Sequence, residues 1–269
     1  MLLENENDEA DWAVCIISSR EDCDTLLGTI EATIEACKNH KAIIDIIING
    51  NILLRDEFYS IFKSENKNSD FLKIRIWYIE LGDKANVFNQ YFHLIWPISN
   101  LVYFVDGYAR PNVDSFDRMA ASLQNQQSKL LIAAVPTEGR SAKYLRESML
   151  ASGGIHGNLF ALTKNAILKI RDKQFFLPLG MYRTDSTIAA AIAFKLDPKI
   201  NKWDLRSVSN VVLEASWSLA IKRQTLFTKV SNKLKQLVRQ GQGRLENLAV
   251  KECFSVNKKN VNELPENVF

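Results

Sequence analysis

Short apolar runs alternate with amphipathic segments along the first half of the chain. Five runs have the length of strands, and their continuity is typical of strands buried on both faces of a sheet. They are residues 12–18, 42–50, 71–79, 101–105 and 129–135. Apolar residues at helical spacing predict helices between them, near 19–37, 54–64, 85–95 and 112–126. Strands that alternate with helices in this way predict a parallel sheet covered by helices.

The first predicted helix carries a start signal. Ser19-Arg20-Glu21-Asp22 matches a capping box, in which Ser19 is the N-cap and Asp22 stands at the third helical position. We therefore expect the helix to begin directly after Ser19.

The regular alternation ends after Pro136. Residues 152–167 are glycine-rich and then helical in pattern, whereas 183–196 predict a helix with an acidic start. Residues 200–215 have the composition of a loop, and the basic stretch 218–240 predicts a long helix. The expected organisation is an acidic tail over 1–11, an α/β domain over 12–215 and a basic helical extension over 216–269.

Composition narrows the class of protein. Of 269 residues, 46% are hydrophobic and 24% charged, and the net charge of +3 is too balanced to indicate a nucleic-acid partner. The first residues lack the basic start and apolar core of a signal peptide, and no apolar run is long enough to span a membrane. The four cysteines form no CxxC pair. These features predict a cytoplasmic protein.

Ligands of parallel sheets bind outside the carboxyl ends of the strands. The residues that follow each predicted strand are therefore the candidate binding residues. They are polar, charged or small, and comprise Ser18, Arg20, Glu21, Asn49, Asn51, Lys84 and Asp106.

The turn after the first strand, SSREDCD, argues against a dinucleotide site. It has no GxGxxG pattern, and its acids would repel a diphosphate at the helix start. A phosphate bound at this edge would need neutralisation by a metal or a lysine. Asp106 could hold a divalent cation, Gly107 would let ligand or metal approach the backbone, and Lys84 could add a positive charge.

Four segments, in order, resemble glycosyltransferase family 2. VCIISSREDCDTLLGTIEATIEAC resembles the family's opening strand and helix, and GDKANVFNQ resembles its segment before the metal-binding strand. VYFVDGYARP resembles its strand that ends in Asp-x-Asp. GGIHGNLFALTKNAI, followed by YRTDSTIAAAI, resembles its acceptor-side pair of segments. The resemblance covers residues 12–200.

The resemblance implies a GT-A-like, Rossmann-type, mostly parallel sheet and an inverting nucleotide-sugar glycosyltransferase. Asp185 would be the general base, and Asp106 would face the ribose and a Mn²⁺ or Mg²⁺ ion. The candidates after the strands would hold the nucleotide-sugar donor. Gly154, His156 and Arg183 would lie on the side of a carbohydrate or lipid-linked acceptor.

Several of these residues have simpler interpretations. Asp185 could cap the helix that it opens, and His156 could be an ordinary loop histidine, although it could also contact acceptor, phosphate or a metal. The basic stretch 218–240 could pack on its own domain or make a peripheral contact with an anionic membrane.

Two departures from the family pattern open further alternatives. Asp106-Gly107-Tyr108 stands in place of Asp-x-Asp, and Asn49-Gly50-Asn51 in place of an aspartate. A phenol is a poor metal ligand, so a catalytically inactive GT-A-like binding or scaffold protein is one alternative. A nucleotidyltransferase is another, although SSREDCD lacks the Gly-rich basic loop that such an enzyme needs.

Overall fold

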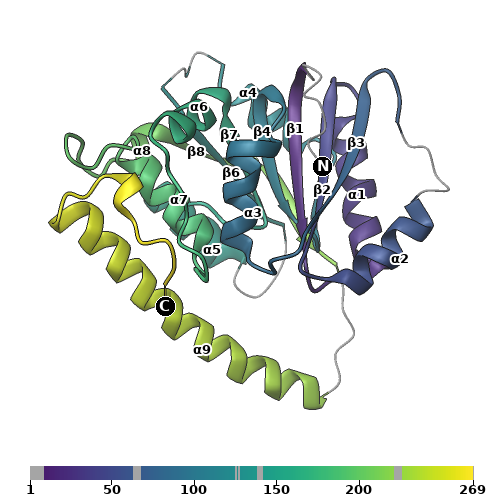
Figure 1. Cartoon of the computed structure of the whole chain (residues 1–269). Helices are drawn as coiled ribbons and strands as arrows, with labels where there is room; N and C mark the ends of the chain where they lie inside the picture. Colours follow the sequence, from purple (N-terminus) through teal and green to yellow (C-terminus); the bar gives the residue numbers. More distant parts are fainter. Residues whose placement is uncertain are drawn as a thin grey trace.

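An eight-stranded sheet forms the centre of the molecule, with helices on both of its faces (Figure 1). The computed structural model describes residues 9–62, 68–124, 126, 128–137, 142–220 and 226–268, without the side chains of 226–237. The strands are β1 (Glu9–Ser18), β2 (Ala42–Asn49), β3 (Leu72–Ile79), β4 (Ile98–Asp106), β5 (Ala109–Pro111), β6 (Leu131–Pro136), β7 (Leu159–Thr163) and β8 (Ser209–Leu219).

The helices follow the predicted alternation through the first half of the chain. The α-helices are α1 (Cys23–Cys37), α2 (Ile52–Phe62), α3 (Lys84–Gln90), α4 (Ser115–Ala121), α5 (Ala142–Ser152), α6 (Lys164–Asp172), α7 (Thr184–Ala193), α8 (Leu205–Val208) and α9 (Leu226–Lys251). Short turns of other helix types are η1 (Tyr91–Ile95), η2 (Glu252–Val256) and η3 (Val261–Glu263).

The strand order is β3-β2-β1-β4-β7-β6-β8-β5. Strands β3, β2, β1 and β4 are parallel to one another, and β7 is antiparallel to both β4 and β6. The chain builds outward from β1 to β3 and then returns to place β4 on the other side of β1. This reversal creates a topological switch point at the carboxyl ends of β1 and β4, where open α/β sheets bind ligands.

Strand β1 supplies both hydrophobic cores because its side chains alternate between the two faces of the sheet. Ala13, Cys15 and Ile17 pack with residues of α3, α6 and α7. The intervening positions pack with residues of α1, α2 and α4 on the opposite face. The continuous apolar run therefore marks a strand covered on both sides, and the predicted GT-A-like α/β fold with a mostly parallel sheet is confirmed.

The start of α1 differs from the sequence prediction. Its N-cap is Asp22, whose carboxylate accepts a hydrogen bond from the Thr25 amide at 2.8 Å. Ser19 lies outside the helix, and its amide donates to Glu21 instead. The capping-box assignment was wrong by three residues because two serines and three acids in one turn offer several local hydrogen-bonding schemes.

The second half departs further from the predicted elements. The glycine-rich segment contains the whole of β7 before helix α6 begins, and the expected loop at 200–215 holds α8 and most of β8. Strand β8 continues to Leu219, across the expected domain boundary at residue 215. The N-terminal strand likewise starts at Glu9, inside the expected acidic tail.

The long C-terminal helix exists, but it begins at Leu226 and extends to Lys251 (Figure 1). Its last turns and the residues after them contribute Val250, Phe254 and Val261 to the core on the α7 face of the sheet. No helix among the described residues is long and apolar enough to cross a membrane. The lysine-rich part of the expected membrane-contact stretch, 221–237, lies outside the described side chains.

Candidate functional site

A cavity of about 950 Å³ opens at the carboxyl ends of β1, β2 and β4. Eight of the residues predicted from the sequence line it, whereas Ser18, Asn51 and Gly154 do not. The eight are Arg20, Glu21, Asn49, Lys84, Asp106, His156, Arg183 and Asp185. The topology thus brings together side chains that are far apart in the sequence.

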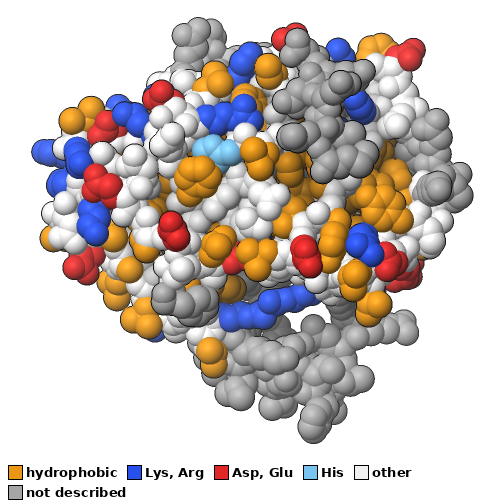
Figure 2. All heavy atoms as spheres, in the orientation of Figure 1, with side chains coloured by type: hydrophobic (Ala, Val, Ile, Leu, Met, Phe, Trp, Pro, Cys, Tyr) orange, Lys and Arg blue, Asp and Glu red, His pale blue; other side chains and the backbone are white. Residues whose placement is uncertain are grey.

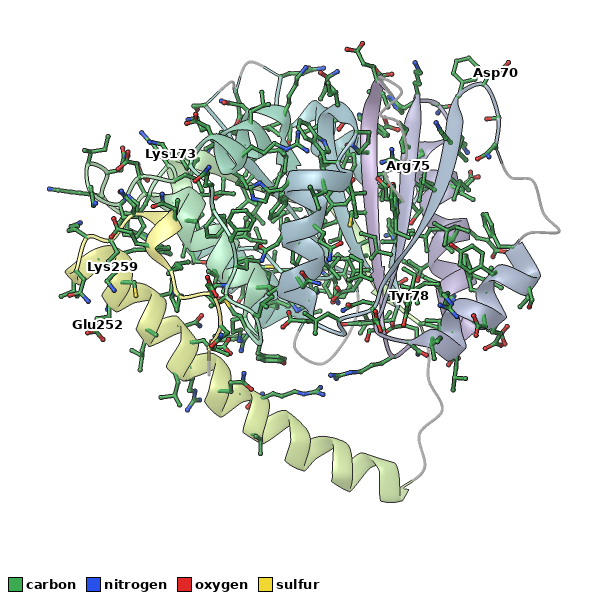
Figure 3. All side chains as sticks on the ribbon, viewed as in Figure 1. Asp70, Arg75, Tyr78, Lys173, Glu252 and Lys259 are labelled. Atoms are coloured by element: carbon green, nitrogen blue, oxygen red, sulfur yellow. The ribbon has the colours of Figure 1, made fainter. Side chains whose placement is uncertain are left out.

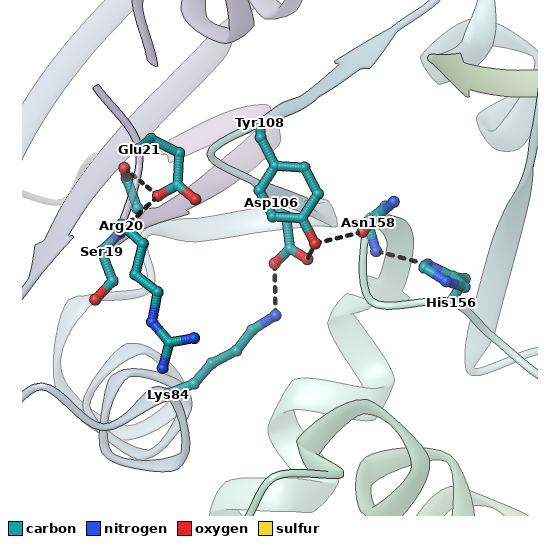
Figure 4. A network of polar contacts seen from close by, with 9 residues as sticks. Ser19, Arg20, Glu21, Lys84, Asp106, Tyr108, His156 and Asn158 are labelled. Atoms are coloured by element: carbon teal, nitrogen blue, oxygen red, sulfur yellow. Dashed lines mark hydrogen bonds and ion pairs between the residues drawn. The ribbon is translucent and has the colours of Figure 1, made fainter. Parts of the chain in front are cut away.

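A chain of polar contacts crosses the centre of the cavity (Figure 4). The Lys84 ammonium lies 2.5 Å from Asp106 Oδ1, and the Tyr108 hydroxyl lies 3.1 Å from Asp106 Oδ2. The same hydroxyl is 3.1 Å from Asn158 Oδ1. A phenol has one hydrogen, so it donates to one of these two oxygens at a time.

The charges in this chain follow from burial and proximity. Burial alone would lower the pKa of Lys84, but the negative charge of Asp106 and the hydrogen bond to it outweigh that effect and raise the pKa. Burial and the Asp106 charge both raise the pKa of Tyr108. Lys84 is therefore an ammonium and Tyr108 a neutral phenol across the physiological pH range.

The turn after β1 is held by a single carboxylate oxygen. Glu21 Oε2 accepts from the Ser18 hydroxyl at 2.8 Å, from the Ser19 amide at 2.8 Å and from the Arg20 amide at 3.0 Å. Ser18, which was expected to contact nucleotide, is fully buried and supports this turn.

Gly107 has a packing role that the sequence did not indicate. A Cβ atom on Gly107 would lie 2.7 Å from Ser18 Cβ, and the Gly107 amide donates to the Ile17 carbonyl at 2.8 Å. The close approach expected for ligand or metal is thus made by the neighbouring strand β1. Any larger residue would push β4 away from β1 beside Asp106.

The two asparagines after β2 differ in their surroundings. Asn51 donates to the Ser19 carbonyl at 2.9 Å and accepts from the Leu54 amide at 3.0 Å, so it joins the β1 turn to the start of α2. Asn49 lines the cavity and is 3% exposed, yet its Oδ1 has no hydrogen-bond partner among the described residues. A buried unpaired amide oxygen is costly and marks a place where a ligand donor would be accommodated.

The glycine-rich loop presents His156, Gly157 and Asn158 to the cavity. Gly154 lies outside the lining, where its amide donates to the Ser152 hydroxyl at 3.1 Å. Burial lowers the pKa of His156, although the charges of Asp185 and Asp106 oppose the shift. His156 is therefore neutral at pH 7, and its Nδ1 accepts from the Asn158 amide at 3.3 Å.

Asp185 stands in the first turn of α7, but it is not the N-cap. Arg183 occupies the cap position, and no side-chain hydrogen bond caps this helix. Asp185 lines the cavity, and the position of a Cβ on Gly157 would be 3.3 Å from Asp185 Oδ2 and 3.6 Å from Lys84 Nζ. The simple capping interpretation of Asp185 thus has no hydrogen bond to support it.

Helix α9 forms a wall of the cavity that the sequence did not predict. It contributes Arg239 and Gln242 to the lining. Buried Glu246 accepts from the amides of Tyr182 and Arg183 at 3.0 and 2.8 Å. Figure 2 shows Lys and Arg side chains along the lower edge of this face. The unmatched positive charge of residues 218–240 was the available signal; packing on its own domain was one of its two interpretations, but a place in the cavity wall was not predicted.

Asp83 fixes the loop before Asp185 from the side opposite Glu246. Asp83 caps α3 by accepting from the amides of Ala85 and Asn86 at 2.7 and 3.2 Å, and it also accepts from the Gly180 amide at 2.5 Å. The loop that precedes Asp185 is therefore held between α3 and α9. Sequence reasoning missed Asp83, Tyr182 and Asn158. Each of them has a partner that lies far along the chain, namely Gly180, Glu246 and Tyr108.

The donor set at Asp106 does not fit a protein-held divalent cation. No group of three or more His, Cys, Asp or Glu residues among the described side chains is arranged to hold a metal ion. Both oxygens of Asp106 already contact hydrogen-bond donors, and a neutral phenol stands where the family has its second acid. A metal bound here would have one protein carboxylate, in competition with an ammonium.

The fold is that of solved nucleotide-sugar glycosyltransferases, while no family model and no curated protein matches the sequence. A mannosyltransferase from Pyrobaculum calidifontis, solved with GDP-Man and Mn²⁺, matches with a TM-score of 0.64 at 12% identity. The match covers 90% of this chain and 65% of that chain, so this chain spans about two thirds of that neighbour.

Two further neighbours have the same architecture. GalNAc-T7, with UDP, GalNAc and Mn²⁺, matches at a TM-score of 0.53 and 12% identity, over 80% of this chain and 44% of that one. Glucosyl-3-phosphoglycerate synthase from Mycobacterium tuberculosis matches at 0.51 and 10% identity, over 84% and 77%. At such identities the likeness establishes the GT-A-like fold alone.

Proposed function

We propose that this chain is a glycosyltransferase of the family 2 type, which transfers a sugar from a nucleoside-diphosphate donor to a hydroxyl acceptor with inversion. The observation that carries the proposal is the meeting of Asn49, Lys84, Asp106 and Asp185 in one cavity at the switch point of the sheet. Nucleotide-binding sheets hold their ligands at this place.

The donor would lie against the carboxyl ends of β1, β2 and β4. Arg20, Glu21 and Asn49 line that end of the cavity and would surround the nucleotide, with the unpaired Asn49 Oδ1 accepting a base or ribose hydrogen. Asp106 and Lys84 lie further along the same wall and would meet the ribose and the diphosphate.

The acceptor would enter between the glycine-rich loop, the loop before α7, and α9. In the transfer step an acceptor oxygen forms a bond to the anomeric carbon while the bond from that carbon to the diphosphate breaks. The acceptor's proton passes to Asp185, and the electron pair of the broken bond goes to the leaving diphosphate oxygen. Asp185 suits the role of base because no described residue engages its carboxylate in a hydrogen bond or ion pair.

A panel assay tests the proposal. Wild-type protein would be screened by thermal shift with UDP-, GDP-, ADP- and CMP-linked sugars and by release of the nucleotide (UDP, GDP, ADP or CMP), each with and without Mn²⁺. A donor at 100 times its Kd adds about 2.7 kcal/mol of stability. If no nucleotide or nucleotide sugar shifts the melting curve under any condition, the proposed function is wrong.

One observation favours a second candidate, the catalytically inactive binding protein. The Tyr108 hydroxyl is within hydrogen-bonding distance of Asp106 Oδ2. Tyr108 stands at the position where the family pattern has its second acid. An inactive protein would bind nucleotide sugar in the same screen but release no product with any acceptor. The two candidates therefore differ in turnover and agree in binding.

A further inference from the structure

We propose that the ammonium of Lys84 supplies the positive charge that the donor diphosphate requires, in the place where relatives of this fold use a divalent cation, so that donor binding is independent of metal. The inference rests on the proposed function and adds to it the chemistry by which the leaving group is stabilised. It starts from the poor fit of the Asp106 donor set to a metal.

Lys84 is held in position from both ends. Its backbone begins α3 directly after the Asp83 cap, and its ammonium is bound to Asp106 at 2.5 Å. The side chain retains 33% exposure, against 13% for Asp106. The ammonium is therefore fixed by a partly buried carboxylate while it remains open to a ligand in the cavity, and two of its three hydrogens are free for phosphate oxygens.

Lys84 also lies close to the proposed base. Lys84 Nζ and Asp185 Oδ2 are within 3.6 and 3.3 Å of the same point, the position of a Cβ on Gly157. When a sugar is transferred to an acceptor beside Asp185, the leaving diphosphate would thus be within reach of the Lys84 ammonium. Any side chain at position 157 would fill the space between Lys84 and Asp185, which accounts for the glycine at this position.

The rest of the charge needed by a diphosphate is present in the same cavity. Arg20, Arg183 and Arg239 line it, and none forms an ion pair with a carboxylate among the described residues. The buried Nε atom of Arg183 has no hydrogen-bond partner there at all. When the bond from the anomeric carbon to the diphosphate breaks, the electron pair goes to an oxygen that Lys84 can stabilise, while the arginines add positive potential to the cavity.

The experiment measures binding of UDP, GDP, ADP and CDP by isothermal titration, in EDTA and again in Mn²⁺. The expected result is that at least one nucleoside diphosphate binds in EDTA within about twofold of its affinity in Mn²⁺. In Lys84→Met that affinity falls about tenfold or more, since a hydrogen bond to a charged group is worth about 1.5–3 kcal/mol. Affinity for the matching nucleoside, which has no phosphate, stays within about twofold.

Two variants keep the test interpretable. Lys84→Arg preserves the charge and should retain metal-independent binding. It keeps the inference testable even if Lys84→Met destabilises the fold. Lys173→Met is the matched control, because Lys173 also pairs with an aspartate, Asp197 at 3.1 Å, but on the surface outside the cavity (Figure 3). It should bind like wild type.

The outcomes separate this inference from the proposed function. Binding that requires Mn²⁺ overturns the inference and leaves a metal-dependent glycosyltransferase. Equal binding by Lys84→Met and wild type in EDTA also overturns the inference, because the charge would then not come from Lys84. Absence of any nucleotide binding, with or without Mn²⁺, overturns the proposed function itself.

Discussion

The two walls of the cavity hold their charges in opposite ways. On the wall formed by β1, β4 and α3, each carboxylate has partners: Glu21 binds two backbone amides, Asp83 three, and Asp106 an ammonium. On the wall formed by α7 and α9, neither Asp185 nor Arg239 forms an ion pair with any of the described residues. The carboxylates of the first wall have partners before any ligand binds, whereas the second wall retains charged groups that have no partner among the described residues.

This difference indicates a separate role for each wall. Unpaired charges in a partly buried site cost stability, and such costs are concentrated at functional sites. A satisfied wall presents a fixed surface to a nucleotide, and an unsatisfied wall can accept a proton or bind an anionic group. The predictions below break or sharpen this contrast, from the largest expected effect to the smallest.

Deleting residues 238–269 should have the largest effect, because it removes the α9 wall together with part of the core. Phe254 is fully buried, and Val250 and Val261 pack in the same cluster. Loss of one buried Phe side chain typically costs about 3–5 kcal/mol, against a total stability of about 5–15 kcal/mol. We expect the truncated chain to lose its cooperative melting transition in calorimetry.

The opposite result would be informative about α9. A truncated protein that melts at the wild-type temperature and still binds nucleotide would mean that α9 is an appendage and does not stabilise the domain. The unpaired wall would then be a surface feature without a role in holding the fold.

Replacing Asp185 with Asn should reduce turnover most strongly among single changes. A positioned general base contributes about 10²–10⁴ in rate, and the nearly isosteric amide cannot accept a proton at neutral pH. We expect transfer to fall at least about a hundredfold while donor affinity, measured by titration, changes little. The loss of a helix-dipole interaction should cost no more than about 1 kcal/mol.

A matched control for this change is Asp172→Asn, at the exposed end of α6 and outside the cavity. It should leave both turnover and affinity unaltered. Full turnover in Asp185→Asn would show that the unpaired carboxylate on this wall is not the base.

The contrast between the walls also explains what the sequence could predict. The β1–β4 half was predictable, because strands buried on both faces produce continuous apolar runs and the residues after them fall at one edge of the sheet. Five of the seven candidates that follow these strands line the cavity for this reason, whereas His156, Arg183 and Asp185 were predicted from the family resemblance. Ser18 and Asn51 do not line the cavity because their side chains form hydrogen bonds within the turns after β1 and β2. Ser18 donates to Glu21, and Asn51 bonds to the Ser19 carbonyl and the Leu54 amide.

The second wall was not predictable in the same way. Strand β7 is antiparallel and follows a glycine-rich loop, and α9 reaches the cavity only through tertiary packing. Glu246 illustrates the difficulty: nothing in its local sequence indicates that it binds the amides of Tyr182 and Arg183, more than sixty residues earlier. Such contacts depend on how helices pack, which periodicity does not specify.

Glu246→Ala should have an intermediate effect, because it removes a carboxylate that accepts hydrogen bonds from the loop before Asp185. The amides of Tyr182 and Arg183 would lose the acceptor of their part-buried hydrogen bonds; a fully buried unsatisfied group costs about 1–3 kcal/mol, which is the upper bound here. We expect a lower melting temperature and a turnover loss greater than the loss of donor affinity, since the loop before Asp185 would be released. Denaturant titration and kinetics would measure the two effects.

Glu252→Ala provides the control for that change. Glu252 is exposed and follows the end of α9 (Figure 3), so its removal should alter stability by less than about 0.5 kcal/mol. If Glu246→Ala and Glu252→Ala behave alike, the anchoring of the Asp185 loop by α9 is not significant.

The smallest effect concerns His156, which lies where the two walls meet. Burial lowers its pKa in the folded state, with Asp185 and Asp106 opposing and Lys84 and Arg183 reinforcing the shift. The unfolded chain therefore binds more protons in weakly acidic solution, and stability should decline as the pH falls below about 6.5. His156→Gln should show a shallower decline in melting temperature between pH 7.5 and pH 5.5. His93, whose pKa burial also lowers, is present in both proteins, so its contribution cancels in the comparison. Equal slopes for the two proteins would mean that His156 is not held neutral at the junction of the walls.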